Sequence, residues 1–222
     1  DVTAIDFLIL AFNDSTPVCS KKVTLQFAPK TPEGEWHAEL VIGRGGIKAG
    51  ALSLPYGTEF HRGSYWTTDC SNEKIAVYDL QSRLIKEIRS DFLVTPADLK
   101  IHKGKVYVVD ETEHNVKVFS LEGVLLNTFG EHSNLPAMED NPTLDQGKLN
   151  LPLGVAVTDE LIVIVDYGNN RIQGFDHNWN LLWVSLNAKG DEIMWNYPYY
   201  IEYLPARELF AITNRGADEI VL

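Results

Sequence analysis

Short apolar runs alternate with polar turns along most of this 222-residue chain. The pattern is clearest between residues 151 and 186, where polar turns at 159–160, 167–170 and 177–178 separate runs rich in Val, Ile and Leu. Such runs, bounded by Gly, Asn and Asp, predict strands joined by tight turns. None of them has the spacing of three and four residues that an amphipathic helix requires. We therefore expect an antiparallel meander of four strands at 151–158, 161–165, 171–175 and 181–186.

The same unit occurs at least three times, and each copy places an Asp fourteen positions after a Pro. The pairs are Pro55 and Asp69, Pro96 and Asp110, and Pro152 and Asp166. A fourth copy begins at Pro198 and reaches residue 222 within its third expected strand. Repeats of four strands over about 40–50 residues are typical of β-propeller blades. The sequence thus predicts an all-β fold with full blades at residues 52–90, 96–130 and 152–187, and a partial blade at 198–222.

Residues 1–43 are less regular and predict a further partial blade, with strands at 6–12, 23–27 and 38–42. We expect the whole chain, residues 1–222, to form a single propeller domain. A propeller removes its sheet edges only when an integer number of blades closes the ring. Because the expected strands amount to four and a half blades, we expect the chain to belong to an intact ring of five or six. The insert at 131–147 predicts a surface loop, either a tolerated insertion or a loop that shapes a binding face.

Residues 149–176, LNLPLGVAVTDELIVIVDYGNNRIQGFD, resemble the NHL-repeat family. That family has Pro-x-Gly before a short apolar strand, an apolar run that ends in Asp, a turn rich in Asn, and then Arg-Ile-Gln and Phe. The resemblance extends more weakly over residues 38–222, since residues 73–75 and 115–117 do not carry the Asn-Arg-Ile of the pattern. It implies a propeller of four-stranded antiparallel blades and leaves the function open.

The repeated Asp residues permit two interpretations. Asp69, Asp110 and Asp166 could form a ring that binds a metal ion, or each carboxylate could cap the turn that follows its strand. A structural role explains why the residue recurs at one place in every copy, so we expect turn caps. Arg171 follows Asp166 by five positions and is expected to pair with it or with a neighbouring carbonyl.

The net charge of the chain limits the classes of partner that we expect it to bind. The chain has 31 Asp and Glu against 19 Lys and Arg, which gives a formal net charge of −12. Nucleic-acid binding is therefore disfavoured, because contacts with phosphates need an excess of basic residues. No apolar run reaches 18 residues, so we expect no membrane insertion. The two cysteines, Cys19 and Cys70, could form a disulfide or remain buried thiols, and the compartment stays open.

Candidate metal ligands lie on the expected inner strands, which start at each Pro. The NHL-repeat family, which this chain resembles, includes a zinc-dependent lyase whose zinc ligands are histidines directly after the Pro. In this chain those positions hold Tyr56, Ala97, Leu153 and Tyr199. None is a histidine, which argues against that chemistry. Related six-bladed propellers hold calcium in the channel and hydrolyse lactones or esters, and Glu59, Asp98 and Glu202 are the candidate calcium ligands here. Otherwise these carboxylates are solvated channel walls and the protein has no cofactor.

Aromatic residues near the inner-strand starts are the candidate binding residues. Tyr56, Trp195 and Tyr199 combine an apolar body with a polar tip, which suits a binding anchor, although packing between blades would use the same residues. We expect a non-enzymatic module that presents a loop face and the channel mouth to a protein or peptide partner, preferably a basic one. The alternatives are a calcium-dependent hydrolase or lyase and, third, an RNA-binding NHL domain.

Overall fold

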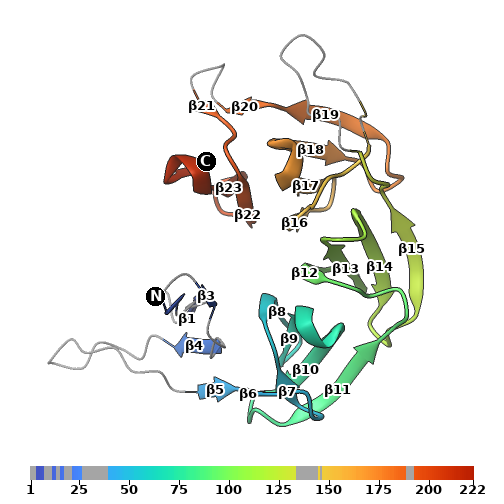
Figure 1. The fold of residues 1–222 in the computed structure, drawn as a ribbon, viewed down its shortest axis with the longest axis vertical. Helices are drawn as coiled ribbons and strands as arrows, with labels where there is room; N and C mark the ends of the chain where they lie inside the picture. Colours follow the sequence, from blue (N-terminus) through green and yellow to red (C-terminus); the bar gives the residue numbers. More distant parts are fainter. Residues whose placement is uncertain are drawn as a thin grey trace, which may run out of the picture.

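The computed structural model describes residues 4–7, 12–13, 16–17, 22–26, 40–133, 145, 147–188 and 193–222. Successive antiparallel sheets are arranged around a common hub, with the first strand of each sheet nearest to it (Figure 1). Apart from three short 3₁₀ turns, every element in these residues is a β-strand. The turns are Cys70–Asn72, Tyr167–Asn169 and Arg215–Ala217. The all-β propeller that the repeat predicts is therefore confirmed.

Three sheets have four strands each in chain order, and we name them blades 1 to 3. Blade 1 consists of β8 (Pro55–His61), β9 (Ser64–Asp69), β10 (Lys74–Asp79) and β11 (Leu84–Arg89). Blade 2 consists of β12 (Pro96–His102), β13 (Lys105–Asp110), β14 (Asn115–Ser120) and β15 (Leu125–Phe129). Blade 3 consists of β16 (Gly154–Val157), β17 (Ile162–Asp166), β18 (Arg171–Phe175) and β19 (Leu181–Ser185).

Three-stranded sheets lie at the two ends of the chain. Blade 4 consists of β22 (Pro198–Leu204), β23 (Leu209–Asn214) and β24 (Glu219–Val221). The amino-terminal sheet consists of β1 (Ala4–Phe7), β4 (Lys22–Gln26) and β5 (Leu40–Ile42), which overlap the three strands expected there. Short two-stranded pairs join β2 (Phe12–Asn13) to β3 (Thr16–Pro17), β6 (Arg44–Gly45) to β7 (Ala51–Leu52), and β20 (Asn187–Ala188) to β21 (Ile193–Met194). Cys19 and most of the insert at 131–147 lie outside the described residues, and the size of an intact ring stays a prediction.

Buried apolar side chains fill the spaces between neighbouring blades. Each central sheet is covered on both faces, so its middle strands are apolar on both sides, and all five residues of β17 are buried. Three clusters result, between blades 1 and 2, 2 and 3, and 3 and 4. Representative members are Val77 and Val108, Val116 and Ile164, and Val163 and Ile201. Burial of each such side chain contributes roughly 1.5–3 kcal/mol, which makes the blade interfaces the main source of stability.

The repeated Asp residues have a structural role, but the N–H groups that they bind differ from the expected ones. Each carboxylate accepts a hydrogen bond from a backbone N–H that lies shortly before the Pro of its own blade. The distances are 2.7 Å for Asp69 and Ser53, 2.9 Å for Asp110 and Thr95, and 2.6 Å for Asp166 and Asn150. The Asp therefore fastens the entry of the inner strand to the end of the second strand, rather than capping the turn that follows.

A buried cation completes this contact in blades 1 to 3. Arg171 Nε lies 2.6 Å from Asp166 Oδ2 with both side chains fully buried, as expected from the sequence. The corresponding pairs are Lys74 and Asp69 at 3.6 Å, and Lys117 and Asp110 at 2.8 Å. Blade 4 has Asn214 in the place of the Asp, and its Oδ1 accepts the N–H of Asn196 at 2.7 Å. The neutral amide makes the same backbone contact without a buried charge.

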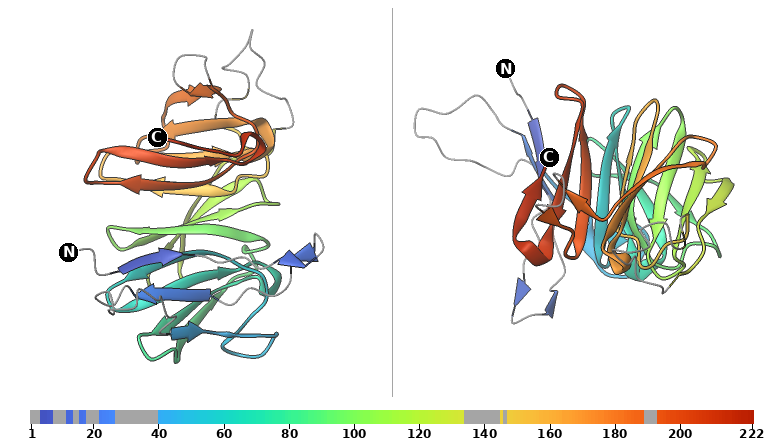
Figure 2. Two further views of the ribbon diagram at one scale, coloured as in Figure 1. Left: turned by 90° about the vertical axis from the view of Figure 1, so that its left-hand side faces the viewer. Right: turned by 90° about the horizontal axis from the view of Figure 1, so that it is seen from above.

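The turns between strands lie on two opposite faces of the blades (Figure 2). We call the face on which β8, β12 and β22 begin the mouth face. Because β8 and β9 pair antiparallel, with Pro55 opposite Asp69, the turns that follow β9, β13, β17 and β23 lie on the same face. No helix in the described ranges is long and apolar enough to cross a bilayer.

Candidate functional site

Equivalent repeat positions lie at equivalent heights along the wall of the hub. The inner strands are neighbours, since β12 contacts β8 and β16, and β16 contacts β22. Directly after each Pro, at the upper level, are Tyr56, Ala97, Leu153 and Tyr199. Four positions after each Pro, at the deeper level, are Glu59, Lys100, Ala156 and Glu202. With a rise of roughly 3.3 Å per residue, the two levels are about 10 Å apart.

A β-bulge shapes the start of the inner strand in blades 1, 2 and 4. The N–H of Gly57 in the first bulge donates to Thr68 Oγ1 at 2.8 Å, and the N–H of Tyr200 donates to Thr213 Oγ1 at 2.9 Å. Only glycine fits at position 57, because a Cβ there would lie 2.7 Å from the Cα of Asp98. The bulges thus hold neighbouring inner strands in close contact.

An ionic cluster occupies the deeper level of the hub. Lys100 Nζ lies 2.7 Å from Glu202 Oε2 and 3.8 Å from Glu59 Oε2, and it also contacts the Tyr200 hydroxyl at 3.2 Å. Asp98 is buried, and its carboxylate accepts the N–H of Leu99 at 2.8 Å and the N–H of Val155 at 3.1 Å. Residues from three blades therefore share one ammonium group among three carboxylates.

Burial and the neighbouring charges shift the pKa values of the groups in this cluster. Burial raises the pKa of Glu59 to about 7, although Lys100 opposes the rise. Burial likewise raises the pKa of Asp98 to about 6. For Lys100, burial disfavours the charged form, but Asp98, Tyr200 and Glu202 outweigh it and raise the pKa above its usual value. Lys100 therefore stays charged, while Glu59 titrates near neutral pH.

The three predicted calcium ligands thus converge, but around a lysine that the sequence analysis did not single out. Lys100 occupies the same repeat position as Glu59 and Glu202, and the three residues meet at the hub. Among the described residues, no group of three or more His, Cys, Asp and Glu side chains has the arrangement of a metal site. A calcium ion in the hub would have to compete with this ammonium group.

Four tyrosines surround the upper level, and we call them the tyrosine mouth: Tyr56, Tyr167, Tyr197 and Tyr199. The hydroxyls of Tyr56 and Tyr199 are hydrogen-bonded to each other. Ring centroids of Tyr167 lie 5.4 Å from Tyr197 and 6.1 Å from Tyr199. Burial raises the pKa of both Tyr56 and Tyr199, so their hydroxyls remain protonated at ordinary pH. The mouth therefore combines aromatic faces with neutral hydrogen-bonding groups.

Residues directly after the repeated Asp or Asn form the rim of the mouth: Cys70, Glu111, Tyr167 and Arg215. Arg215 is exposed, and its guanidinium lies 5.5 Å from the centroid of the Tyr199 ring. Glu111 and Arg215 are both electrostatically coupled to Tyr56. Glu111, Tyr167 and Arg215 were not predicted as site residues, although they share one repeat position with Cys70.

Trp195 lies apart from the mouth. Its side chain is buried, it belongs to the cluster between blades 3 and 4, and its Nε1 donates to Ser185 Oγ at 3.1 Å. The structure therefore assigns it the packing role that was the alternative to a binding anchor. Trp195 lies in the crossover between blades, where the repeat does not specify which way a side chain points.

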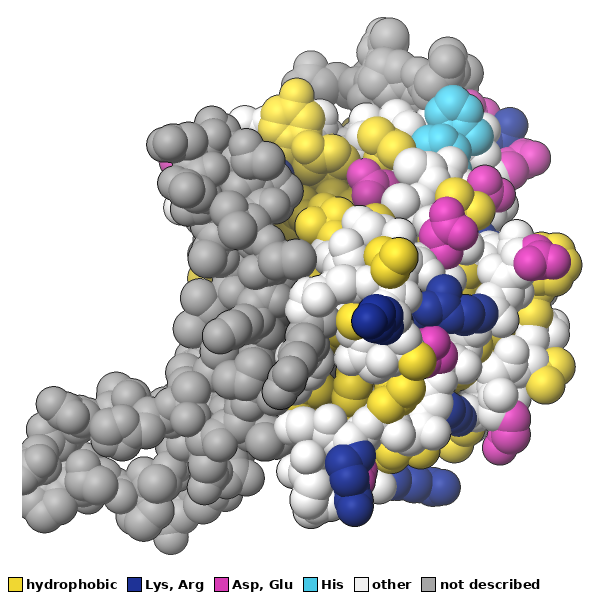
Figure 3. Space-filling view, turned by 60° about the horizontal axis from the view of Figure 1, so that its bottom comes forward, with side chains coloured by type: hydrophobic (Ala, Val, Ile, Leu, Met, Phe, Trp, Pro, Cys, Tyr) yellow, Lys and Arg dark blue, Asp and Glu magenta, His cyan; other side chains and the backbone are white. Residues whose placement is uncertain are grey.

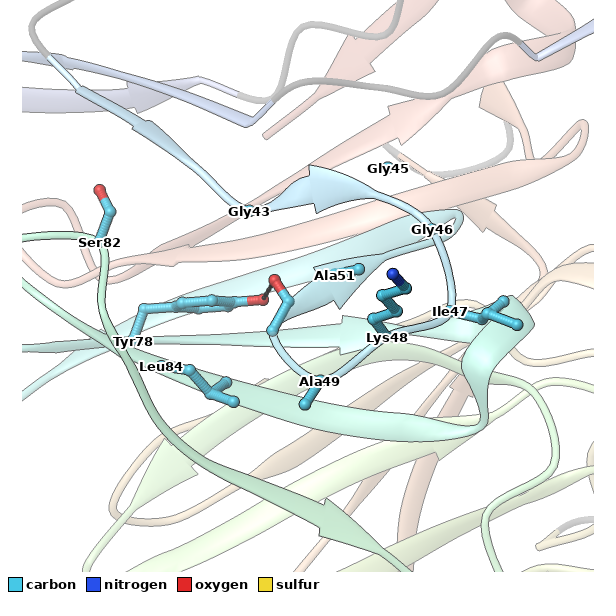
Figure 4. A pocket seen from close by; sticks show the side chains of 11 residues that line it. Gly43, Gly45, Gly46, Ile47, Lys48, Ala49, Ala51, Tyr78, Ser82 and Leu84 are labelled. Carbon is cyan, nitrogen blue, oxygen red and sulfur yellow. Dashed lines mark hydrogen bonds between the residues drawn. The ribbon is translucent and has the colours of Figure 1, made fainter.

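A separate hollow of about 830 Å³ lies beside blade 1, lined by the loop of residues 43–51 together with Tyr78, Ser82 and Leu84 (Figure 4). Tyr78 is almost fully buried, and its hydroxyl donates to the carbonyl of Gly50 at 3.1 Å. None of the candidate site residues lines this hollow. Four of its eleven lining residues are glycines and only Lys48 is charged, so we place the candidate site at the hub, where charged and aromatic side chains of several blades meet.

Comparison with solved structures supports the propeller fold. The chain is similar to a streptogramin B lyase, with 17% identity and a TM-score of 0.55 over 75% of this chain and 50% of the lyase. It is similar to a virginiamycin B lyase from Staphylococcus aureus, with 14% identity and a TM-score of 0.56 over 86% of this chain and 57% of the lyase. An auxiliary nutrient binding protein from Bacteroides thetaiotaomicron has 14% identity and a TM-score of 0.53 over 74% of this chain and 46% of that protein.

At these identities the similarity establishes the fold alone, and this chain spans about half the length of the three proteins. No curated protein sequence matches it. The NHL repeat family matches residues 149–175, the segment that leads into blade 3 and forms its first three strands. The chain therefore contains one segment that matches the NHL repeat, within a fold of successive β-propeller blades.

Proposed function

We propose that the protein is a non-enzymatic binding module that captures an extended peptide segment of a protein partner at the tyrosine mouth. One observation carries this proposal: Tyr56, Tyr167, Tyr197 and Tyr199 approach one another at one end of the hub although they come from three blades and the crossover before blade 4. Tyr197 is 50% exposed, and the other three are half-buried. Tyrosines held this way offer large rigid surfaces with a polar tip, which is the composition of binding hot spots.

The chemistry of the mouth suits a peptide. One of the Tyr56 and Tyr199 hydroxyls donates to the other, so the pair keeps one O–H group for a peptide carbonyl, and the Tyr167 and Tyr197 rings can pack on side chains. With a formal net charge of −12, the chain attracts a basic partner over long range. On the face drawn in Figure 3, acidic and basic side chains are interspersed, so specificity would come from the mouth rather than from a charged field.

Calcium-dependent hydrolysis or lysis is less well supported. It would use Glu59, Asp98 and Glu202, but these carboxylates already surround the Lys100 ammonium. A calcium ion needs six to eight oxygen ligands, and a cation held 2.7 Å from Glu202 opposes its entry. The hub geometry therefore favours binding at the mouth over calcium chemistry below it. RNA recognition is disfavoured by the acidic charge.

Peptide selection tests the proposal. A phage library of random 12-residue peptides would be panned on the wild-type protein, and the enriched peptides measured by calorimetry. We expect Tyr199→Ala and Tyr56→Ala to weaken the enriched peptides by about tenfold or more, equivalent to about 1.4 kcal/mol. Phe60→Ala is the matched control, because Phe60 is an exposed aromatic at the other end of the same inner strand. Equal affinity of these peptides for Tyr199→Ala, Tyr56→Ala and the wild type would exclude the tyrosine mouth as the binding site.

A further inference from the structure

Two backbone N–H groups on the mouth face are held by the preceding blade. Leu151 and Tyr197, directly before Pro152 and Pro198, both have positive φ, 47° and 51°. Residues other than glycine rarely adopt this conformation, so neighbouring contacts have to stabilise it. In both cases the N–H donates a hydrogen bond to a side chain of the preceding blade. The acceptors are His114 Nδ1 at 2.9 Å for Leu151 and Asn170 Oδ1 at 2.7 Å for Tyr197.

His114 and Asn170 occupy the same place in the repeat. His114 follows the repeated Asp110 by four residues, and Asn170 follows Asp166 by four residues. Both have positive φ, 55° and 49°. The two hydrogen bonds are therefore the same inter-blade contact made by different chemical groups. One joins blade 2 to the entry of blade 3, and the other joins blade 3 to the entry of blade 4.

The two acceptors respond differently to acid. An amide oxygen accepts at every pH, whereas a histidine nitrogen accepts only while the imidazole is neutral. Because Nδ1 of His114 accepts the N–H of Leu151, the ring proton must be on Nε2. Protonation would place an N–H on Nδ1, directly opposite the N–H of Leu151, and the hydrogen bond would be replaced by two facing donors.

A second histidine lies against the first. His132 stacks on His114 with ring centroids 4.0 Å apart and planes inclined by 27°. His132 belongs to the same crossover as Leu151, since Leu149 N–H donates to the carbonyl of Glu131 at 2.9 Å and Ser133 N–H donates to the carbonyl of Leu149 at 3.0 Å. Two protonated rings at this separation would repel each other across the interface between blades 2 and 3.

The charged groups around His114 set the direction of its titration. Burial and the neighbouring His132 lower the pKa of His114, and Glu113 in the same turn partly offsets them. Glu131 on the crossover pairs with Lys148 at 3.4 Å, which reduces its influence on the histidines. A histidine with a lowered pKa in the folded state stabilises the fold fully above its unfolded pKa of 6.5, and this contribution is lost as the pH falls below that value.

We propose that His114, stacked on His132, is an acid-sensitive latch between blades 2 and 3, for which Asn170 is the acid-insensitive counterpart between blades 3 and 4. The latch is closed at neutral pH and releases Leu151 on acidification. Leu153, two residues further on, lies at the level of Tyr56 and Tyr199, so release also loosens the upper level of the hub, which the tyrosine mouth surrounds. Only this last consequence, for peptide binding, rests on the proposed function.

Hydrogen exchange of single amides, followed by NMR between about pH 7.5 and pH 5, tests the latch directly. After correction for intrinsic exchange, we expect the protection of Leu151 to fall about tenfold on acidification, the loss of about one hydrogen bond. Protection of Tyr197 should stay constant and serves as the internal control. Parallel changes at both amides, or no change at Leu151, would overturn the proposal.

Substitution of each acceptor side chain by the other provides the second test. His114→Asn copies the Asn170 contact and should keep Leu151 protected without pH dependence, whereas Asn170→His should make Tyr197 acid-sensitive. His132→Asn removes the second ring, so His114 should protonate, and the latch open, at a higher pH. If His114→Asn does not fold, the other two variants still decide the matter. Unchanged exchange of Tyr197 in Asn170→His and of Leu151 in His132→Asn would refute the latch. If amide exchange changes but peptide binding does not, the latch stands, and the result counts against the tyrosine mouth as the peptide site.

Discussion

Lys100 Nζ lies 2.7 Å from Glu202 Oε2, a contact that joins the inner strands of blades 2 and 4 across the hub over 102 positions of sequence. Ala156 occupies the same repeat position on the inner strand of blade 3, which lies between the other two, and it contributes no charge to this level. The tyrosine mouth therefore lies about 10 Å above an ion pair that links two inner strands. Charged groups at this position hold the inner strands together only while both partners are present.

Removal of the ammonium group should destabilise the hub. Lys100→Met keeps the length of the side chain but leaves Glu59, Asp98 and Glu202 without their common partner. We expect the free energy of unfolding at pH 8 to fall by about 3 kcal/mol, because like charges remain in a buried place. Urea denaturation measures the loss. Lys103→Met, which removes an exposed lysine three positions away, should change it by less than about 1 kcal/mol.

Calcium should affect the Tm of the wild-type protein and of Lys100→Met differently. In the wild-type protein the ammonium of Lys100 competes with a metal ion, so we expect calcium chloride to leave the Tm unchanged. In Lys100→Met the three carboxylates are free to share a divalent cation, and calcium should raise the Tm. Thermal melts with and without calcium provide the measurement. A calcium-dependent rise in the wild type would instead favour the calcium-propeller function.

The Asp166–Arg171 pair should show strong coupling. Arg171→Met leaves a buried carboxylate without its cation and should cost about 3–5 kcal/mol of unfolding free energy. Asp166→Asn should also destabilise, because it leaves the guanidinium uncompensated. The double variant leaves no buried charge and places at position 166 the amide that Asn214 provides in blade 4, so its loss should be smaller than the sum of the two single losses. Additive losses in a double-mutant cycle would argue that the two side chains act independently.

Cys70 should be unreactive in the folded protein. Its side chain is 7% exposed, and burial, reinforced by Glu111, raises the pKa of the thiol to about 11. Since the thiolate is the reactive form, we expect a disulfide reagent at pH 8 to modify it about a hundredfold more slowly than a small-molecule thiol. A Cys19→Ser background restricts the signal to Cys70. Rapid modification without denaturant would contradict the buried environment, and full modification in urea confirms that the thiol is present.

Features that depend on local repetition could be predicted from the sequence. The strands of blades 1 to 3 and the pairing of Arg171 with Asp166 follow from patterns within about twenty residues. The repeat also indicated that the Asp has a structural role. It did not show that Asp166 binds the N–H of Asn150, because that contact connects two ends of a blade which meet only after folding.

Features that depend on how blades face one another could be predicted only in part. Tyr56 and Tyr199 were singled out because they follow the Pro of the repeat, and their place at the mouth keeps them as predicted binding residues, whereas the crossover that holds Trp195 gives no sign that its side chain is buried. Lys100 was not predicted because calcium ligands are carboxylates rather than amines, although its repeat position matches that of Glu59. The contact between His114 and Leu151 requires the arrangement of two blades and has no local signal.

The raised pKa of Glu59 has a consequence for stability that is opposite in sign to that of a typical surface carboxylate. Since its pKa is about 7 in the folded protein and 4.5 as an unperturbed group, the folded state binds the proton more tightly. Its contribution is complete below about pH 4.5 and is lost as the pH rises through about 7. A glutamine cannot ionise, so Glu59→Gln should not show this loss. We expect the free energy of unfolding of the variant, relative to that of the wild type, to rise by about 2 kcal/mol between pH 4.5 and pH 8, after allowance for screening. Urea denaturation across this pH range measures the difference, with Glu208→Gln, at an exposed position, as the control. Parallel plots of unfolding free energy against pH for Glu59→Gln and the wild type would show that Glu59 ionises normally in the hub.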